Sequence, residues 1–300
     1  MVLKTLGDLN RLILGGKKKK LVLAAAQDQH SLGAVLKAWQ SNIIEPILIG
    51  DKTGIESICE ASNYDVSNLT IINEPDPDKA TEAAVRLTSS KEADILMKGK
   101  IGTSTLLKGV LNKEWGLRTG NLLSHIALFE VETYHKVIAV TDVAMNIAPN
   151  LQEKIAIVNN SVSCLLRLGY IMPKVAVLGA VEMVNENMEA TLHAALLSKM
   201  NQRDQIKNCI IDGPLAFDNA VSLESARHKG IRSEVAGDTD LLLMPDIEVG
   251  NVLYKSLVFF ARANVASIIL GAAVPIVLTS RSDSEKAKYD SILLAAAASR

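Results

Sequence analysis

Short apolar runs alternate with amphipathic segments through the first hundred residues of this 300-residue chain. The apolar runs are short enough for strands and cover residues 21–26, 43–49, 69–72 and 93–97. The segments with helical spacing between them cover residues 31–40, 52–61 and 77–87. Strands joined through helices form a parallel sheet with helices on both faces, because each connection must cross over the sheet. The sequence therefore predicts an α/β fold. Pro46 suggests that the second strand lies at a sheet edge or starts late.

The alternation stops at residues 116–149 and resumes with a helix from residue 151. The interrupting segment contains a loop and two apolar runs separated by a turn, which predicts a β-hairpin. Here we expect the chain to cross from one domain into a second. Two domains without a long linker share an interface, and the cleft between them is the expected place for a ligand.

Residues 93–112 combine a buried strand, a glycine turn and a hydroxyl-rich helix start. Glycines allow the tight turn, and the first N–H groups of the following helix are available to an anion, which the helix dipole also favours. We therefore interpret the stretch as a phosphate site that consists of Lys98, Lys100, Gly102, Thr103, Ser104, Thr105 and Lys108. The alternative is that the hydroxyls cap the helix and that the lysines are solvated.

Polar residues also follow other apolar runs. Ser280 and Arg281 precede a helix, and a hydroxyl and a guanidinium there could hold an oxyanion or a phosphate. Asp142 and Asn146 could face the same cleft. Plainer alternatives are a helix cap beside a surface arginine and a turn stabilised by the Asp142 side chain. Further candidates for the ligand-facing edge are Arg118, Ser124, His125, Asp212 and Asn251.

Composition argues against several classes of protein. A net charge of −1 and an aromatic share of 4% predict neither a basic surface nor stacking platforms for nucleic acid. No apolar run reaches the roughly 18 residues that a membrane span requires. Cys59, Cys164 and Cys209 lie far apart without metal-ligand spacing, so we expect reduced core residues in a cytoplasmic protein, with no metal site.

Together, six stretches resemble motifs of the phosphate acetyl/butyryltransferase family, and most closely those of its phosphate butyryltransferase branch. They follow one another in the expected order along the chain. The stretches are residues 98–107, 118–125, 141–149, 212–220, 237–255 and 275–284.

The resemblance implies that acyl-CoA and phosphate give acyl phosphate and CoA, with a butyryl or another short or branched acyl group. It implies no cofactor besides these substrates, and a homodimer. It also implies a two-domain, three-layer α/β/α fold similar to that of isocitrate and isopropylmalate dehydrogenases. In that fold we expect residues 1–140 and 277–300 in the first domain, residues 141–276 in the second, and the active site in the cleft between them.

By the same resemblance, Ser280 and Arg281 stabilise the tetrahedral intermediate and polarise the acyl carbonyl. We place Asp142 and Asn146 in the catalytic group with them. Lys108 falls where acetyl-type members tend to have an arginine.

Two positions depart from the acetyl-type pattern. Val143 stands where those members have a cysteine, and the acid proposed as their base falls on Ala287. The base that removes the CoA thiol proton is therefore unassigned, with Asp283 and Asp142 as candidates.

Other functions remain open. The acyl group could be acetyl, or the donor could be an acyl-carrier protein, although a net charge of −1 gives no support for docking an acidic carrier. A non-catalytic sensor of CoA or acyl phosphate would not need the retained Ser280 and Arg281. A dehydrogenase of the same superfamily would need a metal-binding acid cluster, and the sequence shows neither this nor a dinucleotide fingerprint.

Overall fold

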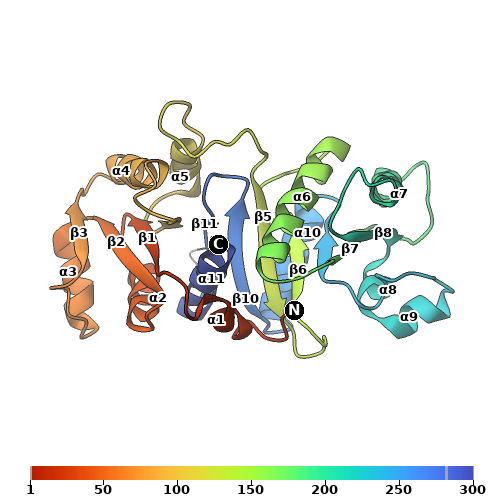
Figure 1. The fold of residues 1–300 in the computed structure, drawn as a ribbon, viewed down its shortest axis with the longest axis horizontal. Coiled ribbons are helices and arrows are strands. Elements are labelled where there is room, and N and C mark those ends of the chain that lie inside the picture. Colours follow the sequence, from red (N-terminus) through yellow and green to blue (C-terminus); the bar gives the residue numbers. More distant parts are fainter. Residues whose placement is uncertain (1, 281–282, 300) are drawn as a thin grey trace. The chain divides into compact units, whose positions relative to one another are not determined.

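The computed structural model describes residues 2–280 and 283–299, which form a mixed α/β fold with two compact units (Figure 1). We name the two units by their place in the sequence. The central unit contains most of the middle of the chain, Leu122–Val265, together with Met1–Asp8, and the flanking unit contains Leu9–Asn121 and Ala266–Arg300. The boundaries expected from the sequence lie instead at residues 140/141 and 276/277. Each unit has its own set of strands and helices.

The strands of the flanking unit have the order β3-β2-β1-β4-β11-β10. All neighbours in this order are parallel except β10 and β11. The carboxyl ends of β1, β4 and β11 therefore lie at one edge. The strands are β1 (Lys19–Ala24), β2 (Ile44–Gly50), β3 (Thr70–Asn73), β4 (Ile95–Lys98), β10 (Asn264–Leu270) and β11 (Ile276–Val277).

Some of the helices that accompany these strands begin at polar caps. Asp28 accepts a hydrogen bond from the Ser31 amide at the start of α2, and Asp76 caps α4, which begins with Pro77. The last helix, α11, is buried along its final turns and packs against α2. The helices are α1 (Asp8–Ile13), α2 (Gln29–Gln40), α3 (Lys52–Ala61), α4 (Pro77–Ser89), α5 (Thr103–Val110) and α11 (Glu285–Ala298).

The position of β2 corrects one expectation. This strand lies between β1 and β3 and starts before Pro46, so the prediction of an edge or a late start is wrong. The reason is the register, because β3 pairs only with Ile47–Gly50. Pro46 therefore has no strand partner on that side, and its missing N–H leaves no ladder bond unmade there.

The strands of the central unit have the order β5-β6-β9-β7-β8. The expected hairpin is confirmed, because β5 and β6 are antiparallel neighbours, whereas the other pairs are parallel. The strands are β5 (Ser124–Glu130), β6 (Ile138–Thr141), β7 (Lys174–Leu178), β8 (Ile210–Leu215) and β9 (Leu241–Leu243). The helices are α6 (Leu151–Arg167), α7 (Glu189–Gln202), α8 (Phe217–Val221), α9 (Leu223–His228) and α10 (Ile247–Phe259).

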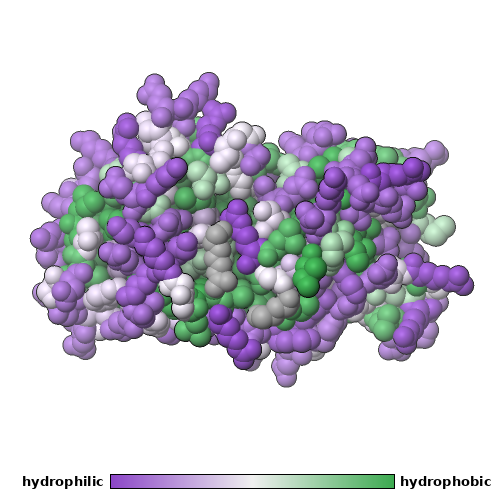
Figure 2. Space-filling model, in the orientation of Figure 1, coloured by the Kyte–Doolittle hydropathy of each residue, from purple (hydrophilic) through white to green (hydrophobic). Residues whose placement is uncertain are grey.

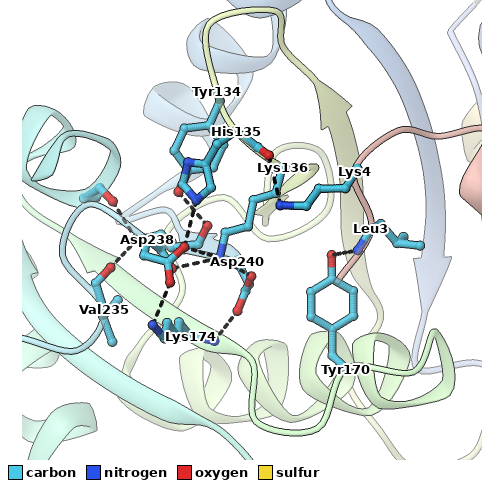
Figure 3. Close-up of polar contacts among 12 residues, drawn as sticks. Leu3, Lys4, Tyr134, His135, Lys136, Tyr170, Lys174, Val235, Asp238 and Asp240 are labelled. Carbon is cyan, nitrogen blue, oxygen red and sulfur yellow. Dashed lines mark hydrogen bonds and ion pairs between the residues drawn. The ribbon is translucent and has the colours of Figure 1, made fainter. Parts of the chain in front are cut away.

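The N-terminal segment belongs to the central unit for a visible reason. The Leu3 amide donates to the Tyr170 hydroxyl at 3.3 Å (Figure 3). The Leu3 carbonyl accepts from the Val137 amide at 3.0 Å. The Leu6 amide donates to the Glu130 carboxylate at 2.8 Å. These bonds attach the segment to the β5–β6 hairpin and to the end of α6, which sequence periodicity could not indicate.

A cluster of buried and half-buried charges joins the amino ends of β6, β9 and β7 (Figure 3). The Lys136 ammonium lies 2.6 Å from Asp240 and 2.8 Å from Asp238, while the Lys174 ammonium lies 2.7 Å from Asp238. Burial alone would raise the pKa of Asp238, but hydrogen bonds from Lys136, Lys174 and His135 outweigh it and hold the pKa well below its usual range. The stretch 237–240, noticed in the sequence as a motif, therefore ties strands together.

The surface gives no sign of a membrane span. No helix in the described part of the chain is long and apolar enough to cross a bilayer. The face drawn in Figure 2 is mostly hydrophilic, with hydrophobic residues in separate patches.

We expect Asp240→Asn to lower the free energy of unfolding by about 3 kcal/mol. It leaves the buried Lys136 ammonium with Asp238 alone, and breaking a buried pair is costly. The measurement is urea denaturation followed by circular dichroism. Glu82→Gln, which removes the exposed partner of Arg86, is the control and should cost less than about 1 kcal/mol. Equal effects of the two substitutions would contradict this account.

Candidate active site

The loop between β4 and α5 has the geometry of an anion site. Gly99 allows it to pass close to β1, because a Cβ there would collide with the carbonyl oxygens of Ala24 and Ala25. The N-cap of α5 is Gly102, which has no side chain to accept from the helix amides. Among the described residues, no hydrogen-bond partner occupies the amides of residues 103–105. The capping alternative for the three hydroxyls is therefore wrong, and this helix end is open to a ligand.

The three lysines of the loop have different surroundings. Lys98 is buried, and its ammonium lies 3.4 Å from the Gly99 carbonyl and 3.3 Å from the Ile101 carbonyl, so it holds the loop from inside. Lys100 is exposed. Lys108 and Thr105 line a cavity of about 360 Å³ together with Asp78, Glu82 and Trp115. Lys100 and Lys108 thus have surroundings that suit contact with a ligand, and the role of Lys98 as a substrate ligand stays a prediction.

Ser280 lies at the same edge of the sheet as this loop. Val277 of β11 is paired in parallel with Met97 of β4, so Ser280 follows β11 as Lys100 follows β4. The Ser280 amide donates to the Asp283 carboxylate at 2.7 Å. The Ser280 carbonyl accepts from the Lys288 ammonium at 2.8 Å. Arg281 lies outside the described residues.

Arg118 is exposed at the β10–β11 turn. It forms an isolated bridge with Ala272, and the neighbouring Thr119 hydroxyl donates to the Gly271 carbonyl at 2.6 Å. No contact among the described residues joins Arg118 to Ser280. Its role as a substrate ligand stays a prediction.

In the central unit, Asp142 is the centre of a hydrogen-bonded turn after β6. One carboxylate oxygen accepts from the amides of Ala144 and Met145 at 2.8 and 2.9 Å. The other accepts from the His125 amide at 3.1 Å and from the Asn146 side chain at 2.6 Å. A carboxylate offers about four acceptor positions, and here all are occupied. These bonds show the turn alternative for Asp142, and its role as the base for the thiol stays a prediction.

Asn146 and Asn251 complete this group. The Asn146 side chain also donates to the Leu123 carbonyl at 2.9 Å, and that of Asn251 donates to the Val143 carbonyl at 3.3 Å. A Cβ at Gly250 would lie 2.6 Å from the Asp142 carbonyl oxygen, so α10 packs closely on the turn. The structure thus brings together His125, Asp142, Asn146 and Asn251.

Ser124 and Asp212 fit the expectation less well. The Ser124 hydroxyl is fully buried and accepts from the Asn160 side chain at 3.0 Å. Asp212 lies on β8, separated from β6 by β9 and β7, which places the two strands about 14 Å apart. Its carboxylate accepts from the Gly213 amide. No contact among the described residues joins Asp212 to Asp142.

His125 is buried, with 4% of its surface exposed. Its ring lies edge-on to Tyr254, with centroids 6.2 Å apart, and its Nδ1 has no hydrogen-bond partner among the described residues. Burial lowers the pKa of His125 to about 4, although the charge of Asp142 acts in the opposite direction. The imidazole is therefore neutral at physiological pH and cannot supply a positive charge for a phosphate.

Comparison with known proteins identifies the family. Residues 77–296 match the family described as "Phosphate acetyl/butaryl transferase". A phosphate butyryltransferase from Clostridium acetobutylicum is 47% identical over 295 residues, which cover 98% of each chain. A phosphate acetyltransferase from Thermotoga maritima is 48% identical, over 94% of this chain and 95% of the relative. The chain belongs to the phosphate acetyl/butyryltransferase family.

Solved structures agree with this assignment. A branched-chain phosphotransacylase from Enterococcus faecalis V583 has a TM-score of 0.82 at 34% identity, over 94% of this chain and 99% of the other. A 4-hydroxythreonine-4-phosphate dehydrogenase from Burkholderia phymatum has a TM-score of 0.56 at 14% identity, over 94% and 99%, and shows a common fold alone. The butyryltransferase and the acetyltransferase named above are about equally similar to this chain, at 47% and 48% sequence identity. Sequence identity therefore does not indicate which acyl group this family member transfers.

The sequence did not indicate Lys288 or Asn160 as contacts of the candidate site residues. Lys288 contacts Ser280, and Asn160 contacts Ser124. Neither belongs to a recognisable spacing pattern, so no signal short of the tertiary contacts could have found them.

We expect the stability of the protein to fall as the pH decreases from 6.5 towards 4. Between these values the unfolded chain protonates His125, whereas the folded protein keeps it neutral, so unfolding takes up a proton. A shift of this size corresponds to about 3 kcal/mol. Urea denaturation at several pH values should show a smaller slope for His125→Gln than for the wild type. Identical slopes would mean that the buried imidazole titrates normally.

Proposed function

We propose that this chain transfers a butyryl or similar short acyl group between CoA and inorganic phosphate. The observation that carries the proposal is the parallel register of β4 and β11, which places Ser280 at the same edge as the open start of α5. A hydroxyl donor and an anion site at one edge suit an acyl transfer whose nucleophile is a phosphate.

The reaction is a displacement at a carbonyl carbon. A phosphate oxygen bonds to the thioester carbon, and the carbonyl oxygen becomes negatively charged. When the carbonyl re-forms, the carbon–sulfur bond breaks and CoA leaves as a thiolate, which takes up a proton. The amides and hydroxyls of residues 103–105 hold the phosphate, and Ser280 donates to the negatively charged oxygen. Arg281, assigned from the sequence alone, adds a charged donor there.

The base needed in the reverse direction stays unassigned, with Asp142 and Asp283 as the candidates. Asp142 accepts four hydrogen bonds, and one oxygen of Asp283 accepts from the Ser280 amide. A CoA thiol has a reference pKa of about 8.5, so a modest local stabilisation of the thiolate suffices without a strong base.

Several finer points belong to the same proposal. We infer a cytoplasmic homodimer, with CoA thioester, phosphate and acyl phosphate as its only reactants and no cofactor. Three buried free thiols support the cytoplasmic location. The family supports the homodimer, the reactants and the expectation of no cofactor. The likeness to dehydrogenase structures supports a three-layer α/β/α arrangement of the isocitrate and isopropylmalate dehydrogenase type. Light scattering after size-exclusion chromatography tests the dimer.

Thiol release from butyryl-CoA should depend on phosphate. The assay follows free CoA with a thiol reagent across acetyl-, butyryl- and branched-chain acyl-CoA, with and without phosphate. Equal release without phosphate would indicate a thioesterase. No release from any of the thioesters would favour a non-catalytic sensor of CoA or acyl phosphate.

Ser104→Ala should raise the KM for phosphate roughly tenfold and change the KM for acyl-CoA little. The hydroxyl lies in the open first turn of α5, and a hydrogen bond to a charged group is worth about 1.5–3 kcal/mol. Initial rates over a range of both substrates measure the two constants in one experiment. An unchanged KM for phosphate would remove Ser104 from the anion site.

A further inference from the structure

A buried lysine on the last helix points at the loop that carries Ser280. Lys288 has 3% of its surface exposed. Its ammonium donates to the Ser280 carbonyl at 2.8 Å and to the Thr279 hydroxyl at 3.2 Å. Lys288 therefore reaches from α11 to the second and third residues after β11, Thr279 and Ser280.

This placement of a charge is unfavourable by itself. Burial lowers the pKa of Lys288, while the more distant charges of Asp283 and Asp28 act in the opposite direction. No carboxylate among the described residues forms an ion pair with the ammonium, in contrast to Lys136. An apolar side chain would fill the same space at lower cost, because it needs no desolvation. The residue therefore calls for an explanation beyond packing.

The second hold on Ser280 comes from the turn before α11. The Asp283 carboxylate accepts from the Ser280 amide at 2.7 Å, and the Asp283 amide donates to the Ser280 carbonyl at 3.2 Å. Ser284 in turn caps α11 through the Ala287 amide. The Ser280 amide is thus held by the Asp283 carboxylate. The Ser280 carbonyl is held by both the Asp283 amide and the Lys288 ammonium.

We propose that Lys288 is a positioning residue for the acyl transfer: it holds Thr279 and the main chain at Ser280, and so fixes Ser280 at the sheet edge from which the anion loop also emerges. This inference rests on the proposed function of Ser280. Lys288 is 3% exposed and directs two of its three N–H donors at protein oxygens, so in this proposal it acts through Thr279 and Ser280 and not by contact with the substrate. Its loss should therefore act on the transition state, where a donor displaced by about 1 Å can cost on the order of 10²-fold in rate.

The test is Lys288→Met, which keeps the length of the side chain and removes the charge. We expect kcat to fall roughly 10- to 100-fold, with the KM values for acyl-CoA and phosphate changing less than about twofold. Thermal stability should be unchanged or higher, because the substitution removes a buried charge without leaving an ion-pair partner behind. Lys286→Met is the matched control, since Lys286 lies on the same helix, is exposed and pairs with Asp290.

Hydrogen–deuterium exchange provides a readout that does not depend on activity. Peptides that cover residues 276–284 should exchange faster in Lys288→Met than in the wild type or in Lys286→Met. An unchanged kcat in Lys288→Met, or unchanged exchange in these peptides, would overturn the inference. If the wild type releases no CoA with phosphate, the proposed function fails, and the exchange experiment still decides whether Lys288 restrains the loop.

Discussion

The candidate active site depends on the parallel pairing of β4 with β1 on one side and β11 on the other. Two residue pairs, Ile276 with Leu96 and Val277 with Met97, align the end of the chain with its first third. Because parallel strands present their carboxyl ends at the same edge, the loops after β4 and β11 emerge together. A one-residue slip would turn the side chains of β11 to the other face of the sheet and would shift Ser280 relative to the anion loop.

Two buried lysines support these loops in the same unusual way. Lys98 approaches the carbonyls of Gly99 and Ile101, and Lys288 approaches the carbonyl of Ser280. Main-chain oxygens compensate a buried ammonium less fully than a carboxylate does, so the position of Lys288 costs stability. In the central unit, Lys136 has carboxylate partners and serves stability instead. The contrast is between Lys136, which pairs with carboxylates, and Lys288, whose ammonium donates to a carbonyl and a hydroxyl among the described residues.

In the central unit, a residue predicted to be catalytic also stabilises a turn of the main chain. Asp142 follows a buried strand and has the right chemistry for a base, yet its two oxygens accept four hydrogen bonds from the protein. His125 beside it is kept neutral by burial. The Asp142 carboxylate stabilises the turn after β6 through the amides of Ala144 and Met145, and it also accepts a hydrogen bond from the Asn146 side chain.

The sequence by itself determined the α/β class, the hairpin, most helix starts and the family. Apolar periodicity, caps such as Asp28 and Asp76, and ordered motifs are local properties, so they can be read along the chain. Only the tertiary structure decided that the N-terminal segment joins the central unit, that Pro46 lies inside a sheet and that Asp212 is remote from Asp142. It also revealed Lys288 behind Ser280. These features depend on strand order and register, which arise from contacts between residues far apart in the sequence and leave no periodic trace in it.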